Sequence, residues 1–285
     1  MINSEKNRLK DKAFQYFGLG CTILGLLVLA VFLGDIIMKG IGRIDWDFLT
    51  SFPSMRAKKA GILSAWVGTL WMLGLTAFIS IPIGIGAGIY FEEYAKKSRL
   101  ANLLEINLAN LAGVPSIIYG LLGLEIFVRS MGMGTSLLAG ACTLALLILP
   151  IIIVSTREAL RAVPNSIRQA SYGMGANTWQ TIWHQVLPAS MGGILTGIIL
   201  SLSRAIGETA PLIVTGALAY VAFVPSGPMD QYTVMPMQIF NWISRPQQDF
   251  QVNAAAGIII LLCITFLLNG IAVFLRNRWQ KKVKW

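Results

Sequence analysis

Long apolar stretches alternate with polar segments along the chain. Six of them lie at residues 14–38, 60–90, 103–128, 135–155, 192–212 and 254–275. About 20 apolar residues suffice for a helix to cross the hydrocarbon core of a bilayer. The pattern therefore predicts an all-α, polytopic membrane protein with six transmembrane helices. We expect the first stretch to be a retained helix, because it is longer than the apolar core of a signal peptide and lacks a convincing cleavage site.

Proline and glycine mark where these helices are interrupted. Pro82, followed by three glycines at alternate positions, predicts a bend and close packing against a neighbouring helix. A Gly-Val-Pro-Ser sequence at 113–116 breaks the third stretch, which is also the least hydrophobic. Pro211 predicts an interruption at the end of the fifth stretch, followed by a short apolar extension to Val224. Such breaks are tolerated where a helix is buried in protein or lines a cavity.

The distribution of basic residues predicts the orientation of the chain. Only 13% of the residues are charged, against about 25% in soluble domains. Six crossings place both tails on one side, where 15 of the 23 lysines and arginines lie, whereas seven lie on the other side. The positive-inside rule then places both termini and the polar segment 156–190 in the cytoplasm. Five of the seven opposing charges fall in the first external loop, which is the weak point of this count. Because the basic residues form no stripe interleaved with aromatic residues, we expect no nucleic-acid partner.

Residue types that commonly carry catalysis are scarce. The three cysteines all lie within apolar stretches, and His184 is the single histidine. This argues against a disulfide, a multi-histidine metal site and a Ser-His-Asp triad. No Gly-Lys-Ser/Thr sequence of a phosphate-binding loop occurs. We expect a protein that is not an enzyme, binds no cofactor or metal, and depends on a partner for energy.

The polar segment 156–190 carries turn residues and helix-capping residues. Two short helices are expected at 166–174 and 179–186. Gly175 suits the left-handed cap of the first helix, and Asn177 or Thr178 can cap the start of the second. The second helix bears two tryptophans, and we expect a separate transmembrane helix to begin at Pro188. The residues alone leave two interpretations open, a docking surface for a partner or an interfacial loop anchored by its tryptophans.

Two opposite charges lie inside the fifth apolar stretch. Arg204 and Glu208 are four residues apart, which predicts that they share one helix face. An arginine at the centre of a membrane helix costs about 2.5–3.5 kcal/mol on insertion scales, so such residues are usually paired or functional. One interpretation is a self-contained ion pair that holds two helices in register. The other is a wet pathway in which the guanidinium, with Ser203, Thr209 and Glu208 nearby, contacts a tetrahedral oxyanion.

Part of the polar segment resembles the "EAA loop" of importer-type ABC permeases. Gly175, Leu187 and Pro188 stand at the spacing of that motif, whereas Gln169, Ser171 and Gln185 depart from it. The resemblance implies that this loop docks into a cytoplasmic ATPase and couples ATP hydrolysis to transport. The coupling residues it implies are Arg168, Gln169, Ala170, Ser171, Gly175, Ala176, Trp179, Leu187 and Pro188.

Three further stretches resemble the permeases of phosphate-specific (Pst) ABC transporters. They are Ser-Arg-Ala-Ile-Gly-Glu-Thr-Ala-Pro-Leu at 203–212, Leu-Ala-Gly-Val-Pro-Ser-Ile-Ile-Tyr-Gly at 111–120 and Tyr-Phe-Glu-Glu-Tyr at 90–94. The Thr-Ala-Pro sequence is that of the A-type subunit. The resemblance implies a MetI-like type I importer fold and alternating access of phosphate to a pathway containing Ser203, Arg204, Glu208 and Thr209.

The same resemblance implies a set of partners and a location. They are a C-type permease as the other half of a heterodimer, two copies of an ATPase that uses ATP and Mg²⁺, and an external phosphate-binding protein. The protein would lie in the cytoplasmic membrane of a bacterium. Residues 225–253, with Tyr232, Phe240 and Trp242, would dock the binding protein or, alternatively, lie at the lipid interface.

We expect three parts along the chain. They are a tail, first helix and external loop at 1–59, a permease core at 60–275 with its coupling loop at 156–190, and a basic cytoplasmic tail at 276–285. Two alternatives to phosphate import stay open. One is a permease for another oxyanion, such as molybdate or phosphonate, and the other is a non-transporting membrane scaffold or sensor.

Overall fold

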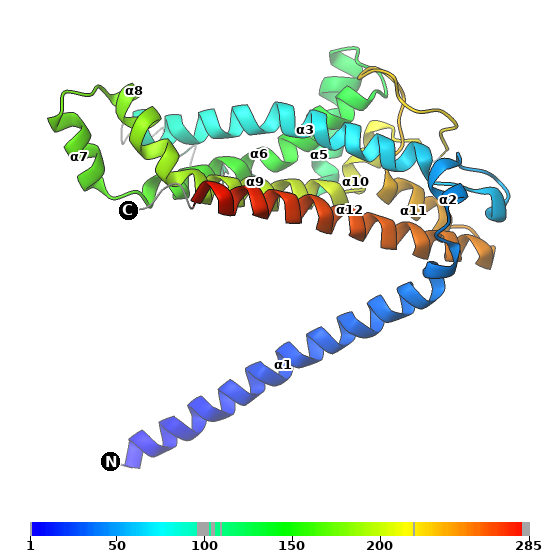
Figure 1. Cartoon of the computed structure of the whole chain (residues 1–285), viewed down its shortest axis with the longest axis horizontal. Helices are drawn as coiled ribbons and strands as arrows, with labels where there is room; N and C mark the ends of the chain where they lie inside the picture. Colours follow the sequence, from blue (N-terminus) through cyan, green and yellow to red (C-terminus); the bar gives the residue numbers. More distant parts are fainter. Residues whose placement is uncertain (1, 96–102, 104–105, 109, 219, 281–285) are drawn as a thin grey trace.

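In the computed structural model the chain forms a bundle of long helices with a folded cap at one end (Figure 1). The structure describes residues 2–95, 103, 106–108, 110–218 and 220–280. Within these residues there are helices and no strands, and five helical segments are long and apolar enough to cross a membrane. They contain α1 (Ile2–Gly40), α3 (Leu63–Ile89), α6 (Leu137–Arg161), α9 (Leu187–Gly207) and α12 (Gln248–Gln280). The predicted all-α membrane fold is confirmed.

The third apolar stretch is broken where the sequence predicts. Helical residues up to Leu111 give way to a turn, and α5 (Ser116–Gly123) begins after Pro115. α5 continues without interruption into a π-helical segment, η4 (Leu124–Ser130). Proline suits the start of a helix and disfavours helical backbone in the residue before it, so it fixes the break here.

Small residues set the spacing between α3, α6 and α9. A side chain on Gly84 of α3 would collide with Ile152 of α6, and one on Gly88 would collide with Thr156. A side chain on Gly197 of α9 would likewise collide with α6. Glycines at such positions allow two helix backbones to approach closely. The close packing predicted for the proline-glycine half of α3 is therefore confirmed.

α9 ends earlier than the sequence predicts. Its last helical residue is Gly207, Glu208 has extended backbone (φ −74°, ψ 126°), and the short helix α10 (Ala210–Thr215) follows. Pro211 accounts for this end, because a proline ring clashes with the carbonyl group four residues before it, here that of Gly207. Glu208 is therefore the C-cap residue and not part of the helix, but its side chain still meets that of Arg204 four residues earlier, as the spacing predicts.

A cap of short helices closes the end of the bundle opposite α7 and α8 (Figure 1). It combines α2 (Trp46–Thr50), the 3-10 turn η2 (Ala57–Lys59) and α11 (Met235–Ile243). The Phe48 and Trp242 rings, 5.7 Å apart, lie in its core. Arg43 donates hydrogen bonds to Asn253 Oδ1 and to the carbonyl groups of residues 58 and 60. At least one of the basic residues that weakened the charge count is therefore an internal support of this cap.

Two aromatic residues expected on a docking surface are instead buried. Tyr232 and Trp242 have 0% and 1% of their surface exposed, whereas Phe240 on the other face of α11 is 53% exposed. The prediction that all three form an external docking surface is wrong for the first two. Their rings fill the interior between the cap and the bundle.

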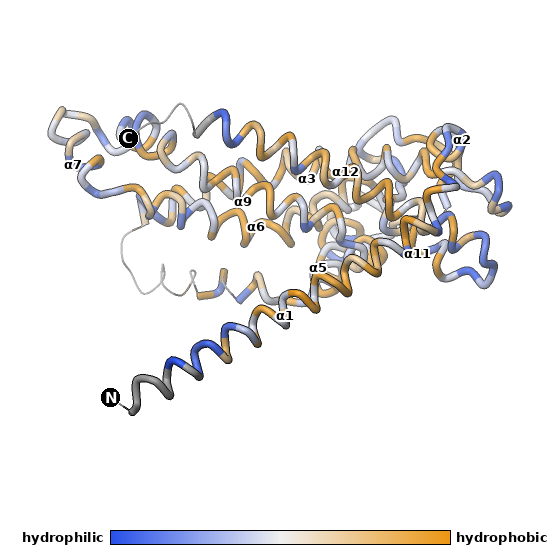
Figure 2. Tube along the Cα trace, turned by 60° about the horizontal axis from the view of Figure 1, so that its bottom comes forward, coloured by the Kyte–Doolittle hydropathy of each residue, from blue (hydrophilic) through white to orange (hydrophobic). Residues whose placement is uncertain are grey.

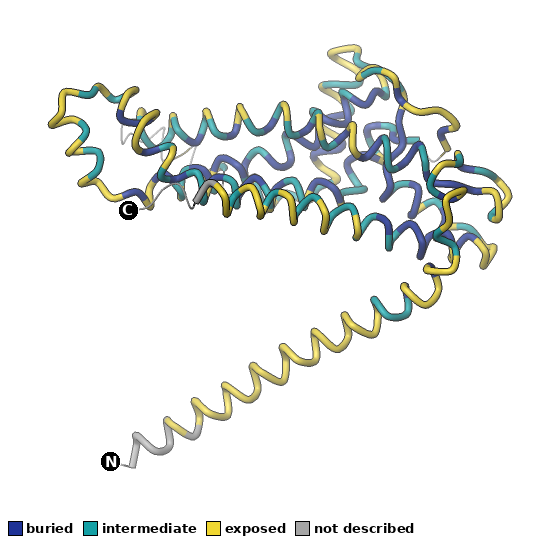
Figure 3. The backbone as a smooth tube through the Cα atoms, viewed as in Figure 1, coloured by how far each residue is buried: buried dark blue, intermediate teal, exposed yellow. Residues whose placement is uncertain are grey.

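α1 leans away from the bundle and is exposed along nearly its whole length (Figures 1 and 3). Its central part is apolar all round, as the colouring of Figure 2 shows. A helix with this surface requires lipid or another apolar partner around it. The described start of α1, the end of α12 and the helices α7 and α8 all lie toward one end of the molecule.

Candidate functional site

The two short helices predicted in the polar segment are present. α7 spans Asn165–Gly173, and Gly175, with φ +85°, follows it in the left-handed conformation. Asn177 caps α8 (Thr178–Thr181), because its side chain accepts from the backbone N–H of Gln180 while the Gln180 side chain accepts from the N–H of Asn177. This reciprocal pair satisfies two otherwise unpaired donors. The local prediction of two capped helices joined at Gly175 is confirmed.

The second short helix is not separated from the transmembrane helix. α8 runs through a π-helical segment, η5 (Ile182–Val186), directly into α9, so that residues 178–207 form one continuous helix. The wider π turn accommodates Pro188, whose ring would otherwise meet the carbonyl group of His184. The expectation of a separate transmembrane helix beginning at Pro188 is wrong, and the polar surface is built on the end of α9 itself.

The exposed side of this surface is aromatic and uncharged. The Trp179 and Trp183 rings stack with their centroids 5.5 Å apart, and both side chains are more than half exposed. Beside them an open hollow of about 800 Å³ separates α7 from α8. Its lining is Ile167, Ala170, Ser171, Met174, Gly175, Ala176, Gln180, His184 and Gln185. Four of the nine residues predicted for coupling, Ala170, Ser171, Gly175 and Ala176, thus line one accessible hollow.

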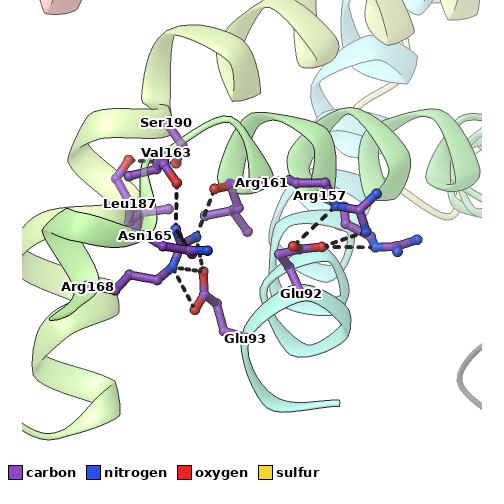
Figure 4. A network of polar contacts seen from close by, with 10 residues as sticks. Glu92, Glu93, Arg157, Arg161, Val163, Asn165, Arg168, Leu187 and Ser190 are labelled. Atoms are coloured by element: carbon purple, nitrogen blue, oxygen red, sulfur yellow. Dashed lines mark hydrogen bonds and ion pairs between the residues drawn. The ribbon is translucent and has the colours of Figure 1, made fainter. Parts of the chain in front are cut away.

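Arg168 and Leu187 differ from the other predicted coupling residues. Leu187 packs against the hydrophobic core between α6 and α9. The Arg168 side chain is only 13% exposed and pairs with Glu93, its Nη2 atom lying 2.7 Å from Oε1 (Figure 4). Both residues hold the loop on the bundle from inside, whereas Gln169 and Ala170 lie on the outer face.

Glu92 and Glu93, at the end of α3, were not predicted as functional residues. They lie on the π-helical segment η3 (Tyr90–Tyr94). Glu92 pairs with Arg157 and Arg161 of α6, and Glu93 pairs with Arg168 of α7 (Figure 4). The available signal was two adjacent acids at one end of an apolar stretch and three arginines in a polar segment predicted on the same side.

The charged pair lies on an accessible side of the chain. Arg204 Nε is 3.2 Å from Glu208 Oε1, and the two side chains are 40% and 17% exposed. Between them in sequence, Ala205 and Ile206 are buried and line a small gap beside α3 with Thr69 and other residues. The apolar side chains of this chain therefore do not enclose the guanidinium group. It can keep its bond to Glu208 and still present free N–H groups to an anion.

The structure does not bring Ser203 to this pair. Its hydroxyl oxygen lies 2.6 Å from Oδ1 of Asn269 on α12 and 2.7 Å from the carbonyl oxygen of Ile199. The hydroxyl therefore serves the packing of α9 on α12. Thr209 is adjacent to Glu208 and precedes α10, where its carbonyl group accepts from the N–H of Ile213.

The described residues contain no cluster of three or more His, Cys, Asp or Glu side chains able to hold a metal ion. The chemistry available at the pair is hydrogen bonding and charge neutralisation. The chemistry available at the hollow is apolar and hydrogen-bonded docking.

The chain is similar to known permeases along most of its length. The family described as "Binding-protein-dependent transport system inner membrane component" matches residues 80–281. The "Phosphate transport system permease protein PstA" of Haemophilus influenzae is 34% identical, covering 91% of this chain and 90% of its own. The "Probable ABC transporter permease protein YqgI" of Bacillus subtilis is 30% identical, covering 97% and 98%. A solved bacterial ABC transporter "involved in the import of the acidic polysaccharide alginate" has the same fold, with a TM-score of 0.64 at 16% identity over 95% of this chain and 98% of its own.

Proposed function

The chain belongs to the family of binding-protein-dependent transport system inner membrane components, and we propose that it is the A-type permease subunit of an ATP-driven importer of inorganic phosphate. It is a multi-pass protein of the inner membrane with the MetI-like fold of ABC importer permeases, and it is a transport subunit, not an enzyme. The observation that carries the choice of substrate is the near-full-length similarity to permeases named for phosphate transport, at 31–34% identity in several bacteria.

The accessible pair of Arg204 and Glu208 supports a pathway for an oxyanion. A guanidinium presents planar N–H groups that match the oxygens of a tetrahedral anion. A carboxylate beside it accepts a hydrogen bond from a P–OH group and repels fully ionised oxygens. The pair thereby favours a protonated anion such as hydrogen phosphate over sulfate. Thr209, next to Glu208, adds a hydroxyl to this pathway.

The hollow between α7 and α8 supports coupling to a cytoplasmic ATPase. Its lining includes the amide side chains of Gln180 and Gln185, the exposed tryptophan stack belongs to the same continuous helix, and Gly175 lies in the turn between the two short helices. ATP and Mg²⁺ are used by that partner, which occurs as a dimer. Closure of the dimer moves α7 and α8 and opens the pathway alternately to the two sides of the membrane.

The remaining partners follow from the family, whose importers combine permeases with an ATPase and a substrate-binding protein. We assign a C-type permease as the other half of a heterodimer and a phosphate-binding protein outside the cell. Exposed cap residues such as Trp46, Met55 and Phe240 offer a surface to the binding protein. Both termini then lie in the cytoplasm, as the charge bias predicts.

Reconstituted uptake tests this function. The chain is purified with its C-type partner and ATPase, placed in vesicles and supplied with the binding protein. We expect ATP-dependent accumulation of phosphate that excess sulfate, molybdate or phosphonate does not inhibit. Accumulation of one of these other anions in preference to phosphate would assign a different substrate. Failure to co-purify with any ATPase would favour a scaffold or sensor.

A further inference from the structure

A buried ion pair joins the coupling loop to the end of α3. Glu93 Oε1 lies 2.7 Å from Arg168 Nη2, and both carboxylate oxygens accept from Arg168 Nε at 3.3–3.4 Å. The Glu93 and Arg168 side chains are 7% and 13% exposed, and Figure 4 shows them pointing toward each other. A two-pronged contact of this kind fixes orientation as well as distance.

The same guanidinium also binds the end of α6. Arg168 Nη1 donates to the carbonyl oxygen of Val163 at 2.6 Å, and Nη2 donates to that of Leu160 at 2.9 Å. These carbonyl groups belong to the last turn of α6 and the residues just after it, where intrahelical donors run out. One side chain of α7 therefore ties together the ends of α3 and α6. No other side chain of α7 has a described hydrogen bond or ion pair to α3.

The neighbouring acid makes a different connection. Glu92 accepts from Arg157 Nε at 3.2 Å and from Arg161 Nη2 at 3.1 Å, and both arginines belong to α6. Glu92 thus holds α3 against α6 within the bundle and makes no described contact with α7. The adjacent residues Glu92 and Glu93 therefore have different roles. Glu92 connects helices within the bundle, and Glu93 connects the bundle to the coupling loop.

α3 leads from this pair to the charged site in the membrane. Thr69 and Thr76 of α3 line the same small gap as Ala205 and Ile206, the residues directly after Arg204. Movement of α3 relative to α9 would therefore change the surroundings of the Arg204–Glu208 pair. The chain of contacts is continuous from α7 through Glu93 and α3 to α9.

We propose that the Glu93–Arg168 pair is the positioning link by which movement of α7 is passed to α3. This inference rests on the proposed function, in which α7 belongs to the surface that the ATPase moves. Neither residue touches substrate or nucleotide. Without the link the ATPase would still bind α7 and α8 and hydrolyse ATP, but α3 would not follow the movement of α7.

The test compares adjacent single variants in the reconstituted transporter. Glu93→Gln keeps the size of the side chain and removes its charge, and Glu92→Gln is the matched control one residue away. Three quantities are measured for each: co-purification of the ATPase, ATP hydrolysis, and phosphate taken up per ATP hydrolysed. For Glu93→Gln we expect retained ATPase and hydrolysis, with uptake per ATP lowered by about tenfold. For Glu92→Gln we expect uptake per ATP close to that of the unaltered protein.

Variants of Arg168 extend the test if a lone buried charge prevents assembly. Arg168→Lys keeps a cation for Glu93 without the guanidinium fork. We therefore expect its uptake per ATP to lie between that of Arg168→Gln and that of the unaltered protein. The double variant Glu93→Gln/Arg168→Gln leaves no unpaired charge and should be no more uncoupled than either single variant.

Two results would overturn the link. One is normal uptake per ATP in Glu93→Gln or in the double variant. The other is an equal loss in Glu92→Gln, which would reduce the pair to general packing. Failure of the unaltered chain to bind the ATPase would instead contradict the proposed function.

Discussion

Gly175 offers a clean test of the coupling loop, because only its backbone is at issue. Its φ of +85° lies in the left-handed region, and a Cβ added there would meet nothing within 4 Å. The residue also closes α7, since its N–H donates to the carbonyl oxygen of Tyr172 at 2.9 Å and the next N–H donates to that of Ser171 at 3.2 Å. Gly175→Val therefore causes no clash and changes only the energy of this backbone conformation.

The size of the effect follows from that conformation. Left-handed backbone costs a residue with a Cβ about 1–2 kcal/mol, and a β-branched side chain lies at the upper end. A difference of about 1.4 kcal/mol is tenfold in an equilibrium. The native turn should thus lose population by about 10- to 30-fold relative to other turns. We expect phosphate uptake per ATP to fall accordingly, while the transmembrane bundle still assembles.

Two controls separate the turn from general effects. Gly173 is the last residue of α7 and also has nothing within 4 Å of an added Cβ, but it is helical. Gly173→Ala should leave coupling intact and stabilise the helix by up to about 1 kcal/mol. Gly175→Asn should lose less than Gly175→Val, because asparagine tolerates left-handed backbone. Normal coupling in Gly175→Val, or equal loss in Gly173→Ala, would refute the reasoning and leave the loop as an anchor.

Three further predictions concern other parts of the chain. Ser203→Ala removes the contact with Asn269, so it should lower the free energy of unfolding by about 0.6 kcal/mol, the typical contribution of a hydrogen bond in a membrane, and leave uptake unchanged. Abolished uptake would instead show that the hydroxyl belongs to the substrate pathway. Hydrogen bonds from the 226–227 turn lower the pKa of Asp230, so its stabilisation of that loop should be present at neutral pH and fade as pH falls through the lowered pKa. Limited proteolysis of the unaltered protein should therefore show more cleavage in this loop as the pH falls. In the Asp230→Asn variant the extent of cleavage should be the same at every pH. Gly68→Ala places a methyl group against the backbone of the loop before α11, so a thermal melt should show a loss of about 1–3 kcal/mol, and an unchanged melt would contradict that packing.

The sequence predicts the elements whose cause is local. Hydrophobic length identifies the long helices, Pro115 the break before α5, and Gly175 with Asn177 the geometry of the coupling loop. In each case one residue type determines one backbone feature. The end of α9 also had a local cause, the clash of the Pro211 ring four residues back, but the continuous apolar run obscured it.

Features that depend on distant residues could not be predicted in this way. Glu93 and Arg168 are 75 positions apart, and nothing near either residue indicates its partner. Tyr232 and Trp242 lie in a polar segment whose composition does not say which side chains face the bundle. Ser203 was grouped with Arg204 by adjacency, although neighbouring residues on a helix point in directions about 100° apart.

Uptake by Arg204→Gln tests the central claim most directly, because glutamine keeps much of the side chain and removes the charge that the oxyanion requires. A hydrogen bond to a charged group contributes about 1.5–3 kcal/mol, so uptake should fall by about tenfold or more. ATPase co-purification should stay unchanged, because Arg204 lies on the last turn of α9, at the opposite end of that helix from α7 and α8. Phosphate uptake by Arg204→Gln at the rate of the unaltered protein would contradict the account, since Arg204 and Glu208 would then form a structural ion pair and not a part of the pathway.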